Sequence, residues 1–98
     1  FIAKGWINMN GTGTISITDS HNVSSITDTS TGRYTVTWDV DNANGENMVL
    51  AGCNPDNNAG AYGGCGTHLA GSAALDFRKA SNDTVHDVND VMAICYGD

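Results

Sequence analysis

Positively charged residues are scarce in this sequence. Lys and Arg together number 4 against 11 Asp and Glu, which gives a formal net charge of −7. A surface with so few basic side chains cannot neutralise phosphate groups, so nucleic acid and anionic lipid are not expected partners. Long apolar runs are also missing, because the longest spans residues 91–96, whereas a membrane-spanning helix needs about 20 apolar residues. The sequence therefore predicts neither nucleic-acid binding nor membrane insertion.

Cysteine is rare as well, and its odd count argues against a disulfide-built scaffold. The three residues are Cys53, Cys65 and Cys95, whereas small secreted domains built on disulfides usually hold an even number. Cys53 and Cys65 could form a disulfide, remain free thiols, or join His68 in a zinc site that lacks its fourth ligand. Cys95 lies in an apolar segment and is most simply a small buried hydrophobic residue. We expect no metal ion and no cofactor.

The signature motifs of common enzymes are missing. The sequence contains no Gly-x-Ser-x-Gly elbow and no His-Glu-x-x-His pair, which place the catalytic groups of serine hydrolases and zinc proteases. Its glycine clusters, at 11–13 and 63–66, lack the lysine and the following helix of a phosphate-binding loop. The Asp- and Asn-rich stretch 39–45 does not align with a calcium-binding loop. We expect a protein that is not an enzyme.

Alternation with a period of two is the clearest pattern that is present. Tyr34, Val36 and Trp38 share one parity while polar residues occupy the other, as in a strand that covers a core on one side. Asn, Ser, Thr and Gly are abundant between such stretches and favour turns over long helices. The sequence predicts an all-β protein, an antiparallel β-sandwich that forms one domain over residues 1–98. Further strands are expected over residues 6–9 and 14–18, which form one hairpin, and over 23–26, which pairs with the Tyr34 strand. Two more are expected over 48–51 and 73–78, and a helix over 69–80 is the alternative to the last.

The last apolar segment, residues 91–96, predicts a strand with two apolar faces. A strand of this kind is usually covered on both sides, but in a small two-layer sandwich one side would ordinarily meet solvent. We therefore expect its second face to pack on another subunit. Val91, Ala93 and Cys95 are the predicted interface residues.

Residues 52–72 show no period of either kind and predict a long loop. Loops held on rigid β-scaffolds often carry recognition, and this one holds exposed-type side chains. The Tyr62 ring could stack on a sugar while neighbouring amides and carboxylates bind hydroxyl groups. The alternative is that Tyr62 only fixes the loop to the sheet. The candidate receptor-binding residues are Asn54, Asp56, Asn57, Asn58, Tyr62 and His68.

Three runs of sequence resemble a known family of viral proteins. They are residues 3–13 (AKGWINMNGTG), 22–28 (NVSSITD) and 31–38 (TGRYTVTW), and the chain closes with an apolar strand and Gly-Asp. These runs are similar to the C-terminal domain of bacteriophage tail-fibre and related fibre proteins, and Gly5 and Arg33 depart from the family pattern. The resemblance implies a β-sandwich tip domain at the end of a longer fibre chain on the virion. It also implies a homotrimer that contacts a bacterial surface receptor, either a glycan or a protein.

Two functions are compatible with these patterns. The first is a non-enzymatic, receptor-binding fibre tip that uses the predicted loop 52–72 for host attachment. The second is a structural trimerisation cap of a tail or capsid fibre that binds no receptor. Deleting the predicted loop would separate them, because a cap should then still assemble and leave adsorption intact.

Overall fold

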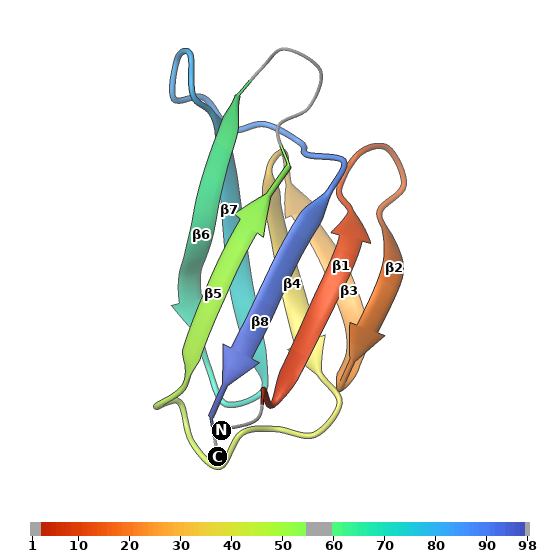
Figure 1. Ribbon diagram of the computed structural model, residues 1–98, viewed down its shortest axis with the longest axis vertical. Coiled ribbons are helices and arrows are strands. Elements are labelled where there is room, and N and C mark those ends of the chain that lie inside the picture. The colour runs from red at the N-terminus through yellow and green to blue at the C-terminus, as the bar shows by residue number, and fades with distance from the viewer. Residues whose placement is uncertain (1–2, 55–59, 98) are drawn as a thin grey trace.

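The protein consists of β-strands arranged in two sheets. The computed structural model describes residues 3–54 and 60–97, and within them there are eight strands and no helix, so none that could cross a membrane. The strands form two four-stranded antiparallel sheets with the orders β2-β1-β8-β5 and β3-β4-β7-β6 (Figure 1). The all-β prediction is therefore confirmed. The strands are β1 (Gly5–Asn10), β2 (Ser16–His21), β3 (Val23–Ser30), β4 (Arg33–Trp38), β5 (Met48–Cys53), β6 (Ala61–His68), β7 (Ser72–Lys79) and β8 (Val91–Tyr96).

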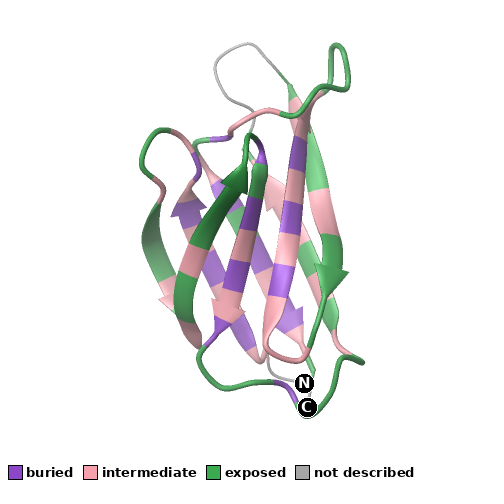
Figure 2. Ribbon diagram, turned by 180° about the vertical axis from the view of Figure 1, so that it is seen from behind, coloured by how far each residue is buried: buried purple, intermediate pink, exposed green. Residues whose placement is uncertain are grey.

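The two sheets face each other across a shared hydrophobic core. Tyr34, Val36 and Trp38 are at most 2% exposed, which confirms the parity predicted from the alternation in β4. On the neighbouring strand β7, alternate residues are buried in the same way, as Figure 2 shows from behind. Both sheets contribute to the core, which gives a sandwich-like arrangement. Its buried members are Ile7, Met9, Tyr34, Val36, Trp38, Ala73, Leu75, Phe77, Val88, Val91, Ala93 and Cys95.

Both predicted hairpins are present, and the doubtful segment 69–80 contains a strand. β1 pairs with β2 and β3 with β4, each antiparallel. Gly13 and Gly32 adopt φ values of 60° and 70° in the connecting turns, a backbone conformation that glycine reaches without a steric penalty. β3 extends to Ser30, beyond the predicted end at residue 26. β7 confirms the strand over the alternative helix.

The prediction of a long loop over residues 52–72 is wrong. β5 continues to Cys53, and β6 occupies Ala61–His68 within the supposed loop. The alternation of apolar and polar side chains that marks a strand is missing from the sequence of β6, because glycines, which have no side chain, take three of its eight positions. One of them, Gly63, is required by packing, since a side chain there would collide with the Phe77 ring. What remains between the strands is residues 54–60 and 69–71, of which 55–59 lie outside the described residues.

The predicted subunit-interface residues are also wrong. Val91, Ala93 and Cys95 are at most 4% exposed and lie in the core of their own chain. In β8 both parities are apolar, so the sequence of this strand alone cannot say which face points inward. Pairing with β1 decides it, because Ala93 lies opposite the buried Ile7 and Val91 opposite the buried Met9. The other parity, which includes Met92, points away from the core.

Candidate functional site

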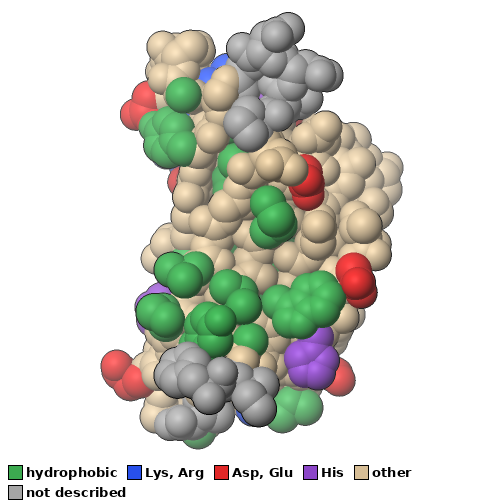
Figure 3. All heavy atoms as spheres, viewed as in Figure 1, with side chains coloured by type: hydrophobic (Ala, Val, Ile, Leu, Met, Phe, Trp, Pro, Cys, Tyr) green, Lys and Arg blue, Asp and Glu red, His purple; other side chains and the backbone are tan. Residues whose placement is uncertain are grey.

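The outer surface of the sheet β2-β1-β8-β5 carries a group of outward-facing apolar side chains, some exposed and some half-buried, here called the apolar face. Its members are Trp6 on β1, Met92 and Ile94 on β8, and Met48 and Leu50 on β5. The strand register places Trp6, Ile94 and Leu50 in one row across three strands. Leu50 is 55% exposed, Met48 48% and Met92 38%. In Figure 3, which views this sheet from outside, apolar side chains gather over the lower half of the face.

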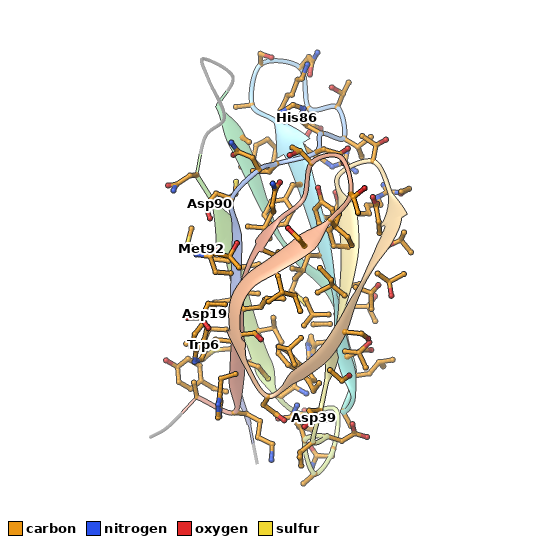
Figure 4. The ribbon with its side chains drawn as sticks, turned by 90° about the vertical axis from the view of Figure 1, so that its right-hand side faces the viewer. Trp6, Asp19, Asp39, His86, Asp90 and Met92 are labelled. Atoms are coloured by element: carbon orange, nitrogen blue, oxygen red, sulfur yellow. The ribbon has the colours of Figure 1, made fainter. Side chains whose placement is uncertain are left out.

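A shallow groove of about 530 Å³ runs through the apolar face. Trp6, Leu50, Met92 and Ile94 line it, while Gly52 leaves open space where a side chain would otherwise stand. Figure 4 shows Trp6 and Met92 on the side of their sheet that faces away from the second sheet. The groove is thus an opening on the surface and not part of the core.

The apolar face carries no charge on the three strands β1, β8 and β5. The outward-facing positions of β1, β8 and β5 are occupied only by apolar residues, asparagine, glycine and Tyr96. On the neighbouring strand β2, His21 lies opposite Trp6 and the carboxylate residue Asp19 lies opposite Asn8. An uncharged apolar centre with a polar margin is the usual composition of a protein contact surface.

Of the predicted receptor-binding residues, those that the structure describes do not come together as one site. Asp56, Asn57 and Asn58 lie outside the described residues. Asn54 is engaged within the chain, because its side-chain amide donates a hydrogen bond of 2.6 Å to Asp90 Oδ2. Tyr62 and His68 both lie on β6, but near opposite ends of the strand.

Tyr62 nevertheless belongs to a polar cluster on the outer surface of the second sheet. Pairing of β6, β7 and β4 brings the outward-facing Tyr62, Gly64, Asp76, Arg78 and Arg33 together, and we call this set the Tyr62 face. The Asp76 carboxylate lies between the two arginines, with Oδ2 at 3.5 Å from Arg33 Nε and 3.6 Å from Arg78 Nη2. Asp76 and Arg78 alternate with Leu75 and Phe77 along the chain, but the sequence does not show which strand lies beside them.

The Tyr62 ring is held in place and remains accessible. Its hydroxyl donates a hydrogen bond to Asp83 Oδ1, and Arg78 Nη1 donates one of 3.1 Å to the Asp83 carbonyl. Tyr62 thus holds a turn, in partial agreement with the predicted fixing role, although it does so from a strand. The residue is still 46% exposed.

The three cysteines are free thiols, which selects one of the three alternatives left open. Cys53 and Cys65 lie on strands of different sheets. Burial raises the pKa of all three thiols, so they stay protonated and poorly nucleophilic at neutral pH. Within the part of the chain that the structure describes, no group of three or more His, Cys, Asp or Glu side chains could hold a metal ion.

A buried tyrosine organises the end of the molecule opposite the chain termini. The Tyr34 hydroxyl donates a 2.7 Å hydrogen bond to the Gly11 carbonyl and accepts one of 3.3 Å from the Val88 amide. Asp87 Oδ1 in turn accepts a 2.8 Å hydrogen bond from the Gly32 amide. Burial, with a smaller contribution from the Asp87 charge, raises the pKa of Tyr34 to about 12. Three connections between strands are therefore fixed to one another at this end.

Comparison with known proteins identifies no relative of this chain. Models of protein families, curated sequences and solved structures give no match to the chain. Function must therefore be inferred from the apolar face, the Tyr62 face and the motif resemblance of residues 3–38.

Proposed function

We propose that this domain is a non-enzymatic subunit of a viral fibre tip that forms a homotrimer through the apolar face and attaches the virion to a bacterial surface receptor. The observation that carries the proposal is the apolar face itself. Three adjacent strands present apolar, uncharged side chains to solvent. Leaving a large apolar side chain exposed forgoes roughly 1.5–3 kcal/mol of burial free energy. Exposed patches of this kind usually mark a contact surface.

The absence of charged side chains from this surface is compatible with a second copy of the chain as its occupant. Two chains that each carry −7 repel one another, so they can associate stably only through a region that brings no further like charge together. The outward-facing positions of β1, β8 and β5 meet this condition. The number of copies, three, comes from the resemblance to phage fibre proteins. In such a trimer each copy of this chain would offer the same face to its neighbours.

Assembly through the apolar face would leave the other surfaces free for a receptor. The sheet β3-β4-β7-β6 lies on the opposite side of the core, so its outer surface would face solvent in the trimer. The two chain ends lie together at one end of the molecule, and the connections fixed by Tyr34 lie at the other (Figure 1). A domain attached to a fibre through either terminus would hold that second end outward.

A trimerisation cap without receptor binding is the second candidate, because the apolar face would serve it equally well. Adsorption of the purified, fluorescently labelled domain to a panel of bacterial strains distinguishes the two. We expect at least one strain to retain the domain after washing, and an excess of unlabelled domain to displace it. A correctly assembled trimer that is retained by no strain would favour the cap.

A further inference from the structure

The Tyr62 face has the composition of a sugar-binding surface. A depression of about 350 Å³ is lined by Tyr62, Gly64, Asp76 and Arg78 among others. A second, of about 230 Å³, adjoins it and includes Arg33, with Asp76 and Gly66 common to both. The hollows exist because β6 carries glycine at its outward positions 64 and 66, so the β-surface beside the Tyr62 ring is bare.

Glycine at position 64 is not needed for the fold. A side-chain Cβ built there would meet no atom within 4 Å, and its φ lies outside the left-handed region. Glycine inside a strand costs stability relative to residues with side chains. Packing explains Gly63, whose side chain would strike Phe77, but it does not explain Gly64. A strand glycine often marks the place where a ligand approaches closely, and here that place adjoins an aromatic ring.

The Tyr62 ring is prepared for stacking before any ligand arrives. Its hydrogen bond to Asp83 fixes the side chain, so little rotamer entropy remains to be lost on binding. The Asp83 turn is itself held by Arg78 Nη1 and by a 2.9 Å hydrogen bond from the Asp83 amide to the Lys79 carbonyl. An aromatic surface that is rigid and 46% exposed is suited to the apolar side of a sugar ring.

The charged groups supply both partners that a hydroxyl group needs. Arg33 and Arg78 can donate hydrogen bonds and Asp76 can accept them. The Asp76 side chain is 35% exposed, so it is partly open to a ligand. With Asp83, the cluster holds two positive and two negative side chains. Its balanced charge, in a chain of −7, favours an uncharged ligand over an acidic one.

We propose that the Tyr62 face binds a neutral glycan, with one sugar stacked on Tyr62 over Gly64 and its hydroxyl groups bonded to Asp76, Arg33 and Arg78. This inference rests on the proposed attachment function, since it names the chemical class of the receptor. In a trimer, three such faces would point outward and bind a repetitive surface glycan with avidity.

The test is binding of the labelled domain to an array of neutral and acidic bacterial polysaccharides. Tyr62→Ala removes the stacking ring, and Gly64→Val fills the hollow from a position where a Cβ meets no atom within 4 Å. Each should lower the apparent affinity for neutral polysaccharide by about tenfold or more, whereas Tyr62→Phe, which keeps the ring, should retain most of it. Ser25→Val is the matched control, because it adds the same side chain to an outward position of β3, outside the two hollows.

Three results would overturn the proposal. They are wild-type binding to none of the polysaccharides, binding to acidic ones alone, and equal binding by the wild type, Tyr62→Ala and Gly64→Val. Thermal melts run beside the array confirm that each variant is folded. Failure here is distinguishable from failure of the proposed function. A trimer that adsorbs to cells regardless of Tyr62 would refute only the glycan site, and a monomer that binds neutral glycan through Tyr62 would refute only the assembly.

Discussion

Replacing Leu50 with Lys should dissociate the proposed trimer while leaving each subunit folded. Leu50 lies in the row formed with Ile94 and Trp6, and 55% of it is exposed in the single chain. Because full burial of a leucine contributes roughly 1.5–3 kcal/mol, covering this exposed half contributes about 1 kcal/mol or more per subunit. Three subunits then lose about 3 kcal/mol or more, which lowers the association constant more than about a hundredfold. Burying the charged ammonium group of the new lysine in the subunit contact weakens association further, because the group loses its hydration.

Leu69→Lys is the matched control for this change. Leu69 is 57% exposed and lies between β6 and β7, outside the apolar face, so the same substitution alters the net charge equally. Light scattering after size exclusion, over a dilution series, should show Leu50→Lys as a monomer and Leu69→Lys as a trimer like the wild type. Circular dichroism checks the fold of both. If the two variants dissociate alike, or neither does, the assignment of the contact to the apolar face is refuted.

Three further changes test the core and the connections between strands that Tyr34 and Gly32 fix to one another. Trp38→Ala removes a side chain that is 2% exposed and should lower the free energy of unfolding by about 3–5 kcal/mol in urea titrations; a loss under about 1 kcal/mol would contradict its core position. Tyr34 ionises near pH 10 when unfolded but near 12 when folded, so stability should fall by about 2–3 kcal/mol as pH rises through this window. Tyr34→Phe should reduce that fall by this amount, and an undiminished fall would contradict the cause. Gly32→Ala places a Cβ at a residue with φ 70°, only 2.5 Å from the backbone oxygen of Phe77. This change should lower the free energy of unfolding by more than about 1 kcal/mol. Gly45→Ala is the control, because a Cβ there meets open space, and it should change the melting temperature little.

Much of the core could be predicted from sequence because its strands alternate cleanly. Val36 and its neighbours in β4 sit between polar residues, so only one parity can face the core, and the structure buries that parity. The same holds for Leu75 in β7. Where alternation is broken, prediction fails for a physical reason. β6 holds glycines at 63, 64 and 66, and its strand conformation is defined by hydrogen bonding to β7 rather than by its own side chains.

The candidate surfaces were only half visible in the sequence. The two apolar parities of β8 indicated a second contact surface, but choosing between Ala93 and Met92 as the outward side requires knowing that β1 lies alongside. Leu50 joins the apolar face through long-range pairing of β5 with β8. In the same way Tyr62 and Asp76 are 14 positions apart in the chain and meet only because β6 pairs with β7. Such non-local pairing carries no short-range sequence signal.

Sedimentation equilibrium of the unmodified domain tests the central claim most directly. If the apolar face is a contact between copies, the domain at micromolar concentration should have a molar mass three times that of one chain. The mass should fall toward that of one chain only on strong dilution. A single species with the mass of one chain throughout the micromolar range would show that the apolar face remains exposed, and it would contradict the proposed assembly.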